Sequence, residues 1–156
     1  MSERFTIRRA TPDDIDMLVE LRNAMLREAA EGGVLGDVSE ALGNTREYFE
    51  EKLPVGEYVC FLAEVEGRVV GVGGMVLFRK PALPQSPLGL EGYILNMLTL
   101  AGFRGKGIAS AIMRELLACA REAGASLVAL KATDAGRRVY GKFGFVENPS
   151  YMQLKL

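Results

Sequence analysis

The segment 104–107, Arg-Gly-Lys-Gly, stands directly before an amphipathic run that predicts a helix over 107–123. A helix N-terminus presents unpaired backbone N–H groups and a partial positive charge, so it attracts anions. Gly105 and Gly107 let the backbone approach a ligand closely, and the flanking Arg104 and Lys106 add positive charge. The loop therefore favours binding of a phosphate or pyrophosphate group. A plain tight turn is the alternative that these residues alone leave open.

Two other kinds of phosphate-binding loop are excluded by spacing. The loop of nucleoside triphosphatases requires Gly-Lys followed by Ser or Thr, but Lys106 is followed by Gly107. The dinucleotide fingerprint requires a third glycine where Ser110 stands, and it normally opens its domain instead of following residue 100.

The chain contains no histidine, which excludes Ser-His-Asp and Cys-His triads and removes the commonest zinc ligand. We therefore expect no metal site. Any proton transfer must use carboxylates, tyrosine, backbone groups or bound water. Cys60 and Cys119 lie among apolar neighbours and are interpreted as structural thiols.

Length and composition indicate one domain over 1–156, because 156 residues with 49% hydrophobic and 25% charged side chains are typical of a soluble globular protein. The uncharged stretch 92–103 is too short to cross a bilayer, so no membrane partner is expected. The N-terminus lacks the apolar core of a signal peptide, which predicts a cytoplasmic protein. Scattered basic residues without interleaved aromatics argue against a nucleic-acid partner.

Hydrophobic periodicity predicts the order β-α-α-β-β-β-α-β-α-β and a mixed α/β sheet. Thr11 followed by Pro12 marks the start of the first helix, which runs up to Gly32-Gly33, and Glu66-Gly67 marks a tight hairpin turn. The predicted strands are 5–9, 58–65, 68–79, 93–100, 126–132, one near Phe145 and 151–156. The further predicted helices lie within 38–53, over 107–123 and over 135–143, and 80–89 is a loop.

Two motifs resemble one family. Arg104-Gly-Lys-Gly107-Ile-Ala109 is similar to the Arg/Gln-x-x-Gly-x-Gly/Ala signature of the GNAT superfamily of acetyl-CoA-dependent N-acetyltransferases, and the segment 139–145 resembles its aromatic-Tyr-x-x-x-Gly-Phe motif. The spacing of the two motifs and the element order agree over essentially the whole chain. The resemblance implies an acyl-CoA N-acyltransferase fold, with a central mixed sheet flanked by about four helices.

The resemblance also implies a site for acetyl-CoA, the expected co-substrate. The strand before the signature splays from its neighbour in this family, so the free backbone groups of Met97, Leu98 and Thr99 are expected to hold the pantetheine arm. The sequence departs from the family at Ala101-Gly102, where proline and an acidic residue are frequent. The loop expected to wrap the pyrophosphate consists of Arg104, Gly105, Lys106, Gly107, Ile108, Ala109 and Ser110.

By the same resemblance, Tyr140 is the expected general acid that protonates the departing CoA thiolate. Thr133 stands where many relatives carry an asparagine, and its hydroxyl is a candidate to bond cofactor or substrate. A backbone N–H near Leu98 is a candidate oxyanion donor. The expected reaction is direct attack of a primary amine on the thioester in a ternary complex, since both cysteines are predicted to lie away from the loop.

The base that deprotonates the amine is left open by the residues. Glu91 and Glu64 are the candidate carboxylates, each with a solvated strand-end charge as its alternative, and a water chain is the third option. Asn96 and Tyr93 are candidates to orient the acceptor.

Charge is divided between the two parts of the chain. Residues 1–57 carry 13 acidic and 7 basic side chains, a net charge of −6, and residues 58–156 carry 7 acidic and 12 basic, a net charge of +5. The acidic part contains the helices expected beside the acceptor, which favours a cationic amine. A homodimer is compatible with the resemblance. A non-catalytic acyl-CoA sensor is the alternative function that the sequence leaves open.

Overall fold

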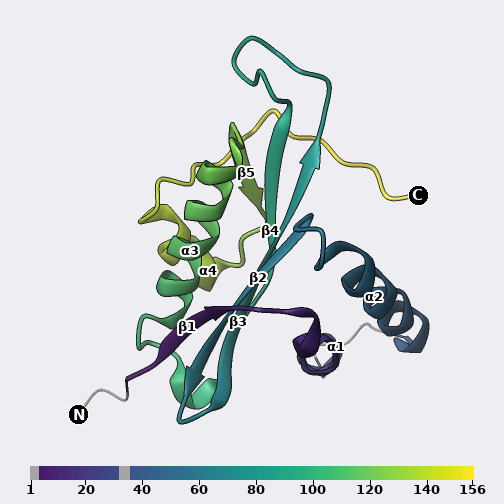
Figure 1. Cartoon of the computed structure of the whole chain (residues 1–156), viewed down its shortest axis with the longest axis vertical. Helices are drawn as coiled ribbons and strands as arrows, with labels where there is room; N and C mark the ends of the chain where they lie inside the picture. The colour runs from purple at the N-terminus through teal and green to yellow at the C-terminus, as the bar shows by residue number, and fades with distance from the viewer. Residues whose placement is uncertain (1–3, 32–35) are drawn as a thin grey trace.

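The computed structural model describes residues 4–31 and 36–156. Its centre is a five-stranded sheet in the order β1-β2-β3-β4-β5 (Figure 1). Neighbouring strands are antiparallel except β4 and β5, which are parallel, so the predicted mixed sheet is confirmed. The strands are β1 (Thr6–Arg9), β2 (Tyr58–Val65), β3 (Arg68–Arg79), β4 (Leu90–Thr99) and β5 (Leu127–Leu130).

In the described part of the chain, four α-helices cover the two faces of the sheet, α1 and α2 on one and α3 and α4 on the other (Figure 1). Each face has its own apolar core, one formed with α3 and one with α1 and α2. The predicted stop of the first helix at Gly32-Gly33 lies outside the described residues. None of the helices in the described ranges is long and apolar enough to cross a membrane. The helices are α1 (Ile15–Glu31), α2 (Ser39–Lys52), α3 (Ile108–Ala123) and α4 (Asp134–Gly141).

Local signals account for the elements that were predicted well. Glu66 and Gly67 both adopt left-handed backbone, with φ of +49° and +76°, which matches the twist of the β2–β3 hairpin. The apolar stripe of α3 is buried, including Ile112 and Leu116, each with an exposed fraction of 0%. Gly124 ends this helix in left-handed conformation with φ of +82°.

The two strands predicted near Phe145 and over 151–156 are wrong. In the described chain no strand follows β5, and the C-terminal segment runs past the end of the sheet to the side of α1 and α2 (Figure 1). The alternating pattern of 151–156 favours extended backbone, but a strand forms only against a partner edge. Here the segment has no strand partner among the described residues, and Tyr151, Met152 and Leu154 are exposed.

Candidate functional site

The centre of the site is the point where β4 separates from β5. The two strands pair only from Glu91 opposite Leu127 to Ile94 opposite Leu130, whereas β4 continues to Thr99. Residues 95–99 therefore have no strand partner on the β5 side within the described chain. Backbone N–H and C=O groups on this edge can bond a ligand. Met97, Leu98 and Thr99 lie on this stretch; their binding of pantetheine stays a prediction.

The glycine loop follows β4 and leads directly into α3. Gly105 and Gly107 have φ of +76° and +84°, in the left-handed region that favours glycine. The first hydrogen bond of the helix joins the N–H of Ala111 to the carbonyl of Gly107 at 3.0 Å. Within the described residues, the N–H groups of Gly105 and of 107–110 donate to no backbone carbonyl. This row of donors at a helix N-terminus is chemically suited to a pyrophosphate.

The two cations of the loop have different surroundings. Arg104 turns back to the end of β4, where its Nε donates to the carbonyl of Thr99 at 2.9 Å, and its Nη2 lies 3.5 Å from a carboxylate oxygen of Glu28. Lys106 Nζ lies 5.0 Å from the centre of the Phe103 ring. Arg104 therefore secures the junction of strand and loop, in addition to the charge that it contributes.

A β-bulge in β4 opens the other face of the sheet. Leu98 pairs with Val72 and Leu95 with Gly74, so two residues of β4, Asn96 and Met97, oppose the single Gly73. Asn96 has φ of +57°, which is uncommon for a residue other than glycine. As a result Leu95 and Asn96 both face α1 and α2, while Met97 packs on the α3 side.

Three side chains from separate elements meet at this bulge. Nη1 of Arg22, on α1, donates to Oδ1 of Asn96, and Nδ2 of Asn96 donates to the hydroxyl of Tyr58 at 2.9 Å. Tyr58, the first residue of β2, has an exposed fraction of 2%. Burial raises the pKa of its hydroxyl far above the usual value, so the group stays protonated. The ring of Phe49 stacks on Tyr58 with centroids 5.0 Å apart.

These residues border a pocket of about 220 Å³ between α1, α2 and β4. A much smaller space of about 10 Å³ shares Arg22, Phe49, Tyr58 and Asn96 with it and is also lined by apolar side chains of α1 and β3. Among the described residues that line the larger pocket, only Arg22 carries a charge. The lining consists of Arg22, Asn44, Thr45, Tyr48, Phe49, Tyr58, Leu95 and Asn96.

Glycines at the centre of β3 make room for this arrangement. A Cβ at Gly74 would overlap the hydroxyl of Tyr58, and a Cβ at Gly73 would overlap the side chains of Met97 and Ile112. Residues 73 and 74 point to opposite faces of the sheet. The glycines therefore admit Tyr58 beneath the pocket and Met97 beneath α3.

The two candidate carboxylate bases do not line the pocket. Glu91 lies at the start of β4, at the far end of the strand from Asn96, and pairs with Nζ of Lys80 at 2.9 Å. Glu64 accepts from Nε of Arg8 at 2.8 Å on β1. Tyr93, considered for orienting the acceptor, is also absent from the lining within the described residues.

The predicted general acid lies on the opposite face of the sheet, in α4. Tyr140 packs against the α3-side core, and its ring contacts Phe145 edge to face with centroids 6.1 Å apart. Burial raises the pKa of its hydroxyl, so the hydroxyl keeps its proton at neutral pH. Thr133 caps α4, because its Oγ1 accepts from the N–H of Gly136 at 3.2 Å. Its expected contact with cofactor or substrate stays a prediction.

Both cysteines lie away from the pocket. Cys60 has an exposed fraction of 0%, and burial raises the pKa of its thiol to about 12. Burial also raises the pKa of the half-buried Cys119 thiol. Neither thiol is activated as a nucleophile, since the reactive form is the thiolate. No group of His, Cys, Asp and Glu side chains in the described ranges is arranged to hold a metal ion.

Sequence reasoning missed Arg22, Tyr48 and Tyr58 as site residues. A signal for Arg22 was present, because it stands four residues after Leu18 and three before Met25 and so shares their inward helix face. A charged residue at an otherwise apolar position of a helix stripe is unexpected there unless it has a function. The tyrosines carry no comparable local signal.

Comparison with known proteins agrees with this geometry. Residues 21–145 match the model of the acetyltransferase (GNAT) family. No curated protein matches the chain. A predicted acetyltransferase from Clostridium acetobutylicum, crystallised with acetyl-CoA, is 28% identical with a TM-score of 0.86, covering 97% of this chain and 96% of that one.

Two further structures are similar over nearly their whole length. A GCN5-related N-acetyltransferase from Ralstonia eutropha is 26% identical with a TM-score of 0.78, covering 97% of this chain and 99% of that one. Glucosamine-6-phosphate N-acetyltransferase from Arabidopsis thaliana is 23% identical with a TM-score of 0.73 and covers 98% and 99%, a likeness of fold alone. The chain, with its splayed strand and glycine loop inside the matched region, belongs to the GNAT family of acetyltransferases.

Proposed function

We propose that the protein transfers the acetyl group of acetyl-CoA to a primary amine by direct attack in a ternary complex. The observation that carries this proposal is the position of β4 between two unlike surfaces. On one side are the edge of 95–99, which has no strand partner on the β5 side within the described chain, and the N–H groups of Gly105 and 107–110, which lie ahead of and at the start of α3. On the other is the pocket that the bulge at Asn96 borders. An acyl donor held at the first surface would meet an acceptor held in the second.

The donor side fits the chemistry of CoA. The pantetheine arm contains amides that pair with the free backbone groups of a strand edge, and its pyrophosphate suits the N–H groups ahead of α3. Bound acetyl-CoA would supply an activated thioester carbonyl, which takes the lone pair of the amine as its bond to sulfur breaks. Tyr140 would give its hydroxyl proton to the departing sulfur, and its raised pKa means that the proton is present on the hydroxyl before the reaction.

The proton of the amine requires another route. Among the described residues the pocket lining contains no carboxylate, and Tyr58 cannot act as the base because burial keeps its hydroxyl protonated. We infer that water accepts this proton, and that the acceptor reacts from its unprotonated form. Catalysis then rests mainly on holding the two reactants together.

Direct transfer is supported by the state of the cysteines. A mechanism through an acetyl-cysteine needs a reactive thiolate, whereas the thiol of Cys60 has a pKa of about 12 and no exposure. Initial-rate measurements should therefore give intersecting lines. Parallel lines together with an isolable acetyl-protein would overturn the ternary complex.

The missing carboxylate also favours a second candidate, a regulatory module that binds acyl-CoA without turnover. Incubation with acetyl-CoA and a set of primary amines, followed by release of free thiol, separates the two. Amine-dependent thiol release supports the transferase. Tight binding of CoA with no thiol release above the rate without protein would favour the regulatory module.

A further inference from the structure

Arg22 carries a charge in a setting where charge is costly. It projects from α1 on the same face as Leu18, Leu21 and Met25, and it is only partly exposed. Removing a guanidinium from water is unfavourable unless a counter-charge or hydrogen-bond acceptors compensate for the lost hydration. Within the described chain, Arg22 has no carboxylate within ion-pairing distance, and its side-chain partner is the neutral amide of Asn96. The charge of Arg22 is therefore not compensated by a described carboxylate, and a bound anion would compensate it.

The guanidinium is held in a fixed orientation with donors to spare. Only Nη1 makes a hydrogen bond in the described structure, so Nε and Nη2 remain able to donate. Asn96 receives that bond and is itself fixed by Tyr58 and by the bulge of β4. A planar guanidinium with two donors free is matched to the two oxygens of a carboxylate or phosphate. Such preorganisation lowers the entropic cost of binding.

The surrounding polar groups are of the kind that complete an anion site. The hydroxyl of Tyr58 accepts from Asn96 and stays protonated, so it is a hydrogen-bond donor beside the pocket. Asn44 and Thr45 of α2 add an amide and a hydroxyl to the same lining. The volume of about 220 Å³ is below the 300 Å³ or more that is usual for sites of drug-sized ligands. A small polar molecule fits these dimensions.

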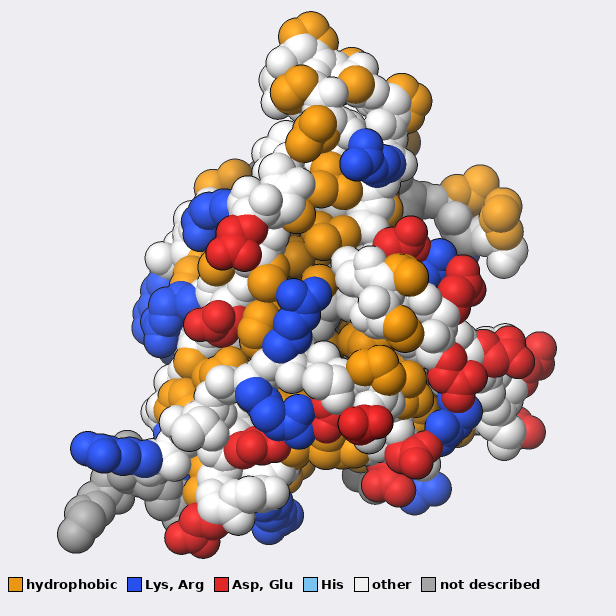
Figure 2. Space-filling view, in the orientation of Figure 1, with side chains coloured by type: hydrophobic (Ala, Val, Ile, Leu, Met, Phe, Trp, Pro, Cys, Tyr) orange, Lys and Arg blue, Asp and Glu red, His pale blue; other side chains and the backbone are white. Residues whose placement is uncertain are grey.

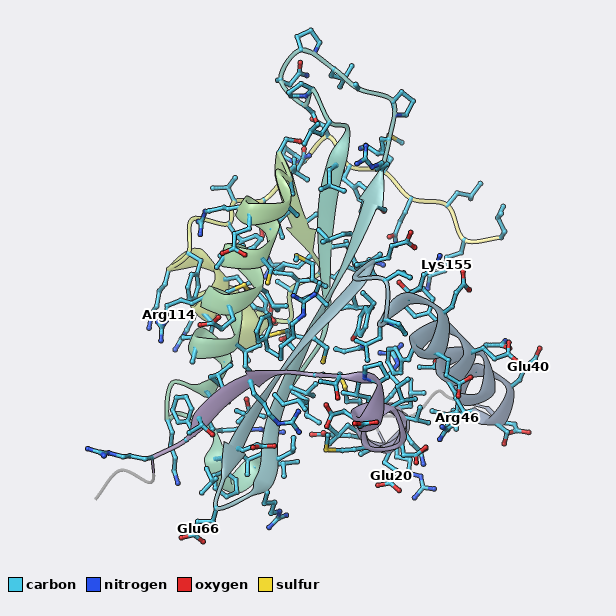
Figure 3. All side chains as sticks on the ribbon, viewed as in Figure 1. Glu20, Glu40, Arg46, Glu66, Arg114 and Lys155 are labelled. Atoms are coloured by element: carbon cyan, nitrogen blue, oxygen red, sulfur yellow. The ribbon has the colours of Figure 1, made fainter. Side chains whose placement is uncertain are left out.

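The acidic side chains of this part of the protein point elsewhere. Glu20 of α1 and Glu40 of α2 project outward from the molecule (Figure 3). Acidic side chains gather over the outer surface of α2 in the space-filling view (Figure 2). Asp16 is exposed and pairs with Arg46, also outside the pocket. Acidic side chains thus lie on the outer surfaces of α1 and α2, while the one charge within the described lining is positive.

The positive charge in the pocket and the negative charges on the outer surface together favour an acceptor that carries both an anionic group and an ammonium group. The acidic outer surfaces of α1 and α2 attract the ammonium form of an amine, and Arg22 attracts an anion inside the pocket. We infer that the acceptor carries a carboxylate or phosphate close to its amino group, and that Arg22 binds this anionic group. The inference rests on the proposed function in taking the pocket as the acceptor site. It replaces a simply cationic amine with an amino acid or an aminoalkyl phosphate.

The test compares acceptors that differ only in the anionic group. One arm uses small α-amino acids beside their amides, and a second uses phosphoethanolamine beside ethanolamine, with rates expressed per unprotonated amine. The expected result is that kcat/KM for the anionic member of at least one pair exceeds that of its neutral partner by tenfold or more. The arm that shows the preference identifies the anion as carboxylate or phosphate.

Variants of Arg22 tie the preference to the residue. In Arg22→Met the ratio of kcat/KM between anionic and neutral acceptors should fall at least tenfold, mainly through a higher KM for the anionic one. Arg22→Lys keeps the charge without the planar fork and should give an intermediate ratio. Arg46→Met removes a charge from the neighbouring α2 surface and should leave the ratio unchanged. If Arg22→Met does not fold, Arg22→Lys still tests whether anion binding requires the paired donors of the planar guanidinium.

The outcomes separate this inference from the proposed function. Turnover of neutral amines as fast as anionic ones, or an unchanged ratio in Arg22→Met, overturns the anion site while acetyl transfer stands. The same acceptors are also titrated calorimetrically into the protein with CoA bound. Binding of an anionic amine that Arg22→Met weakens at least tenfold, without turnover, supports the anion site and rejects acetyl transfer. Absence of both binding and turnover overturns both.

Discussion

The side-chain amide of Asn96 donates to the hydroxyl of Tyr58 across 2.9 Å. The bond connects the bulge of β4 to the first residue of β2 at a position where Tyr58 is almost completely buried. Asn96 is the same residue that accepts from Arg22, so the orientation of the guanidinium depends on this contact. Stability and acceptor recognition should therefore respond together when the contact is removed.

Replacing Tyr58 with Phe tests that coupling. The change leaves Nδ2 of Asn96 without its acceptor, and an unsatisfied buried polar group costs roughly 1–3 kcal/mol. We expect the free energy of unfolding, measured in urea, to fall by about this amount, and kcat/KM for the acceptor to fall as well. Tyr48→Phe is the matched control for the free energy of unfolding, because the Tyr48 hydroxyl makes no side-chain hydrogen bond among the described residues. Equal losses of unfolding free energy in both variants, or an unchanged kcat/KM in Tyr58→Phe, would contradict the coupling.

A second prediction concerns the room beneath Tyr58. Gly74→Ala introduces a Cβ that overlaps the Tyr58 hydroxyl, and overpacking of this kind typically costs about 1–3 kcal/mol. Gly43→Ala is the opposite case, because a Cβ there meets nothing within 4 Å in the interior of α2. It should stabilise the protein by roughly 0.4–1 kcal/mol by restricting the unfolded chain. Thermal unfolding of the two variants gives shifts of opposite sign; a shift of the same sign would reject the packing argument.

The fold could be predicted wherever its signals are local. The hairpin at Glu66-Gly67 and the helix ending at Gly124 depend on residues within a few positions of each other, and both appear at the expected places. The strand expected over 151–156 depends on a partner edge far away in the sequence. Its alternating pattern describes a preference of the segment, and pairing is decided by the rest of the chain.

The candidate site likewise has one part that local sequence predicts and one part that depends on tertiary packing. The glycine loop is continuous in sequence, so its left-handed Gly105 and Gly107 could be anticipated from residue type and position. The pocket is assembled from Arg22, Tyr58 and Asn96, which are brought together only by tertiary packing. The bulge that turns Asn96 toward the pocket arises from the pairing of β4 with β3, and no residue pattern within β4 predicts it.

The glycine loop yields a prediction for cofactor binding. Gly107 has φ of +84°, and an alanine in this left-handed conformation is less stable by roughly 1–2 kcal/mol. Gly107→Ala should therefore reshape the turn ahead of α3 and raise the KM for acetyl-CoA by about tenfold. The control is Gly102→Ala, since that glycine has an ordinary φ and open space around its Cβ position. Equal KM values for the two variants would mean that the loop does not bind the pyrophosphate.

The final prediction concerns the proton given to the departing thiolate. Tyr140→Phe removes the hydroxyl while keeping the ring against Phe145, so stability and the KM for acetyl-CoA should change little. General acid catalysis is worth roughly 10²–10⁴-fold, and kcat should fall within that range. Tyr151→Phe, at an exposed C-terminal position, is the matched control and should keep the parent kcat.

The direction in which kcat/KM changes with pH also follows from the role of Tyr140. Burial raises the pKa of Tyr140 above the usual value near 10, so the protonated, active form persists through neutral and moderately alkaline pH. The acceptor needs its amine unprotonated, so kcat/KM should rise with pH until the amine pKa is passed. Activity should decline only when Tyr140 ionises, above pH 10, and Tyr140→Phe should lack that decline. A parent enzyme that loses activity well below pH 10, with a profile unchanged in Tyr140→Phe, would assign the acid to another group, because a hydroxyl that is absent cannot titrate.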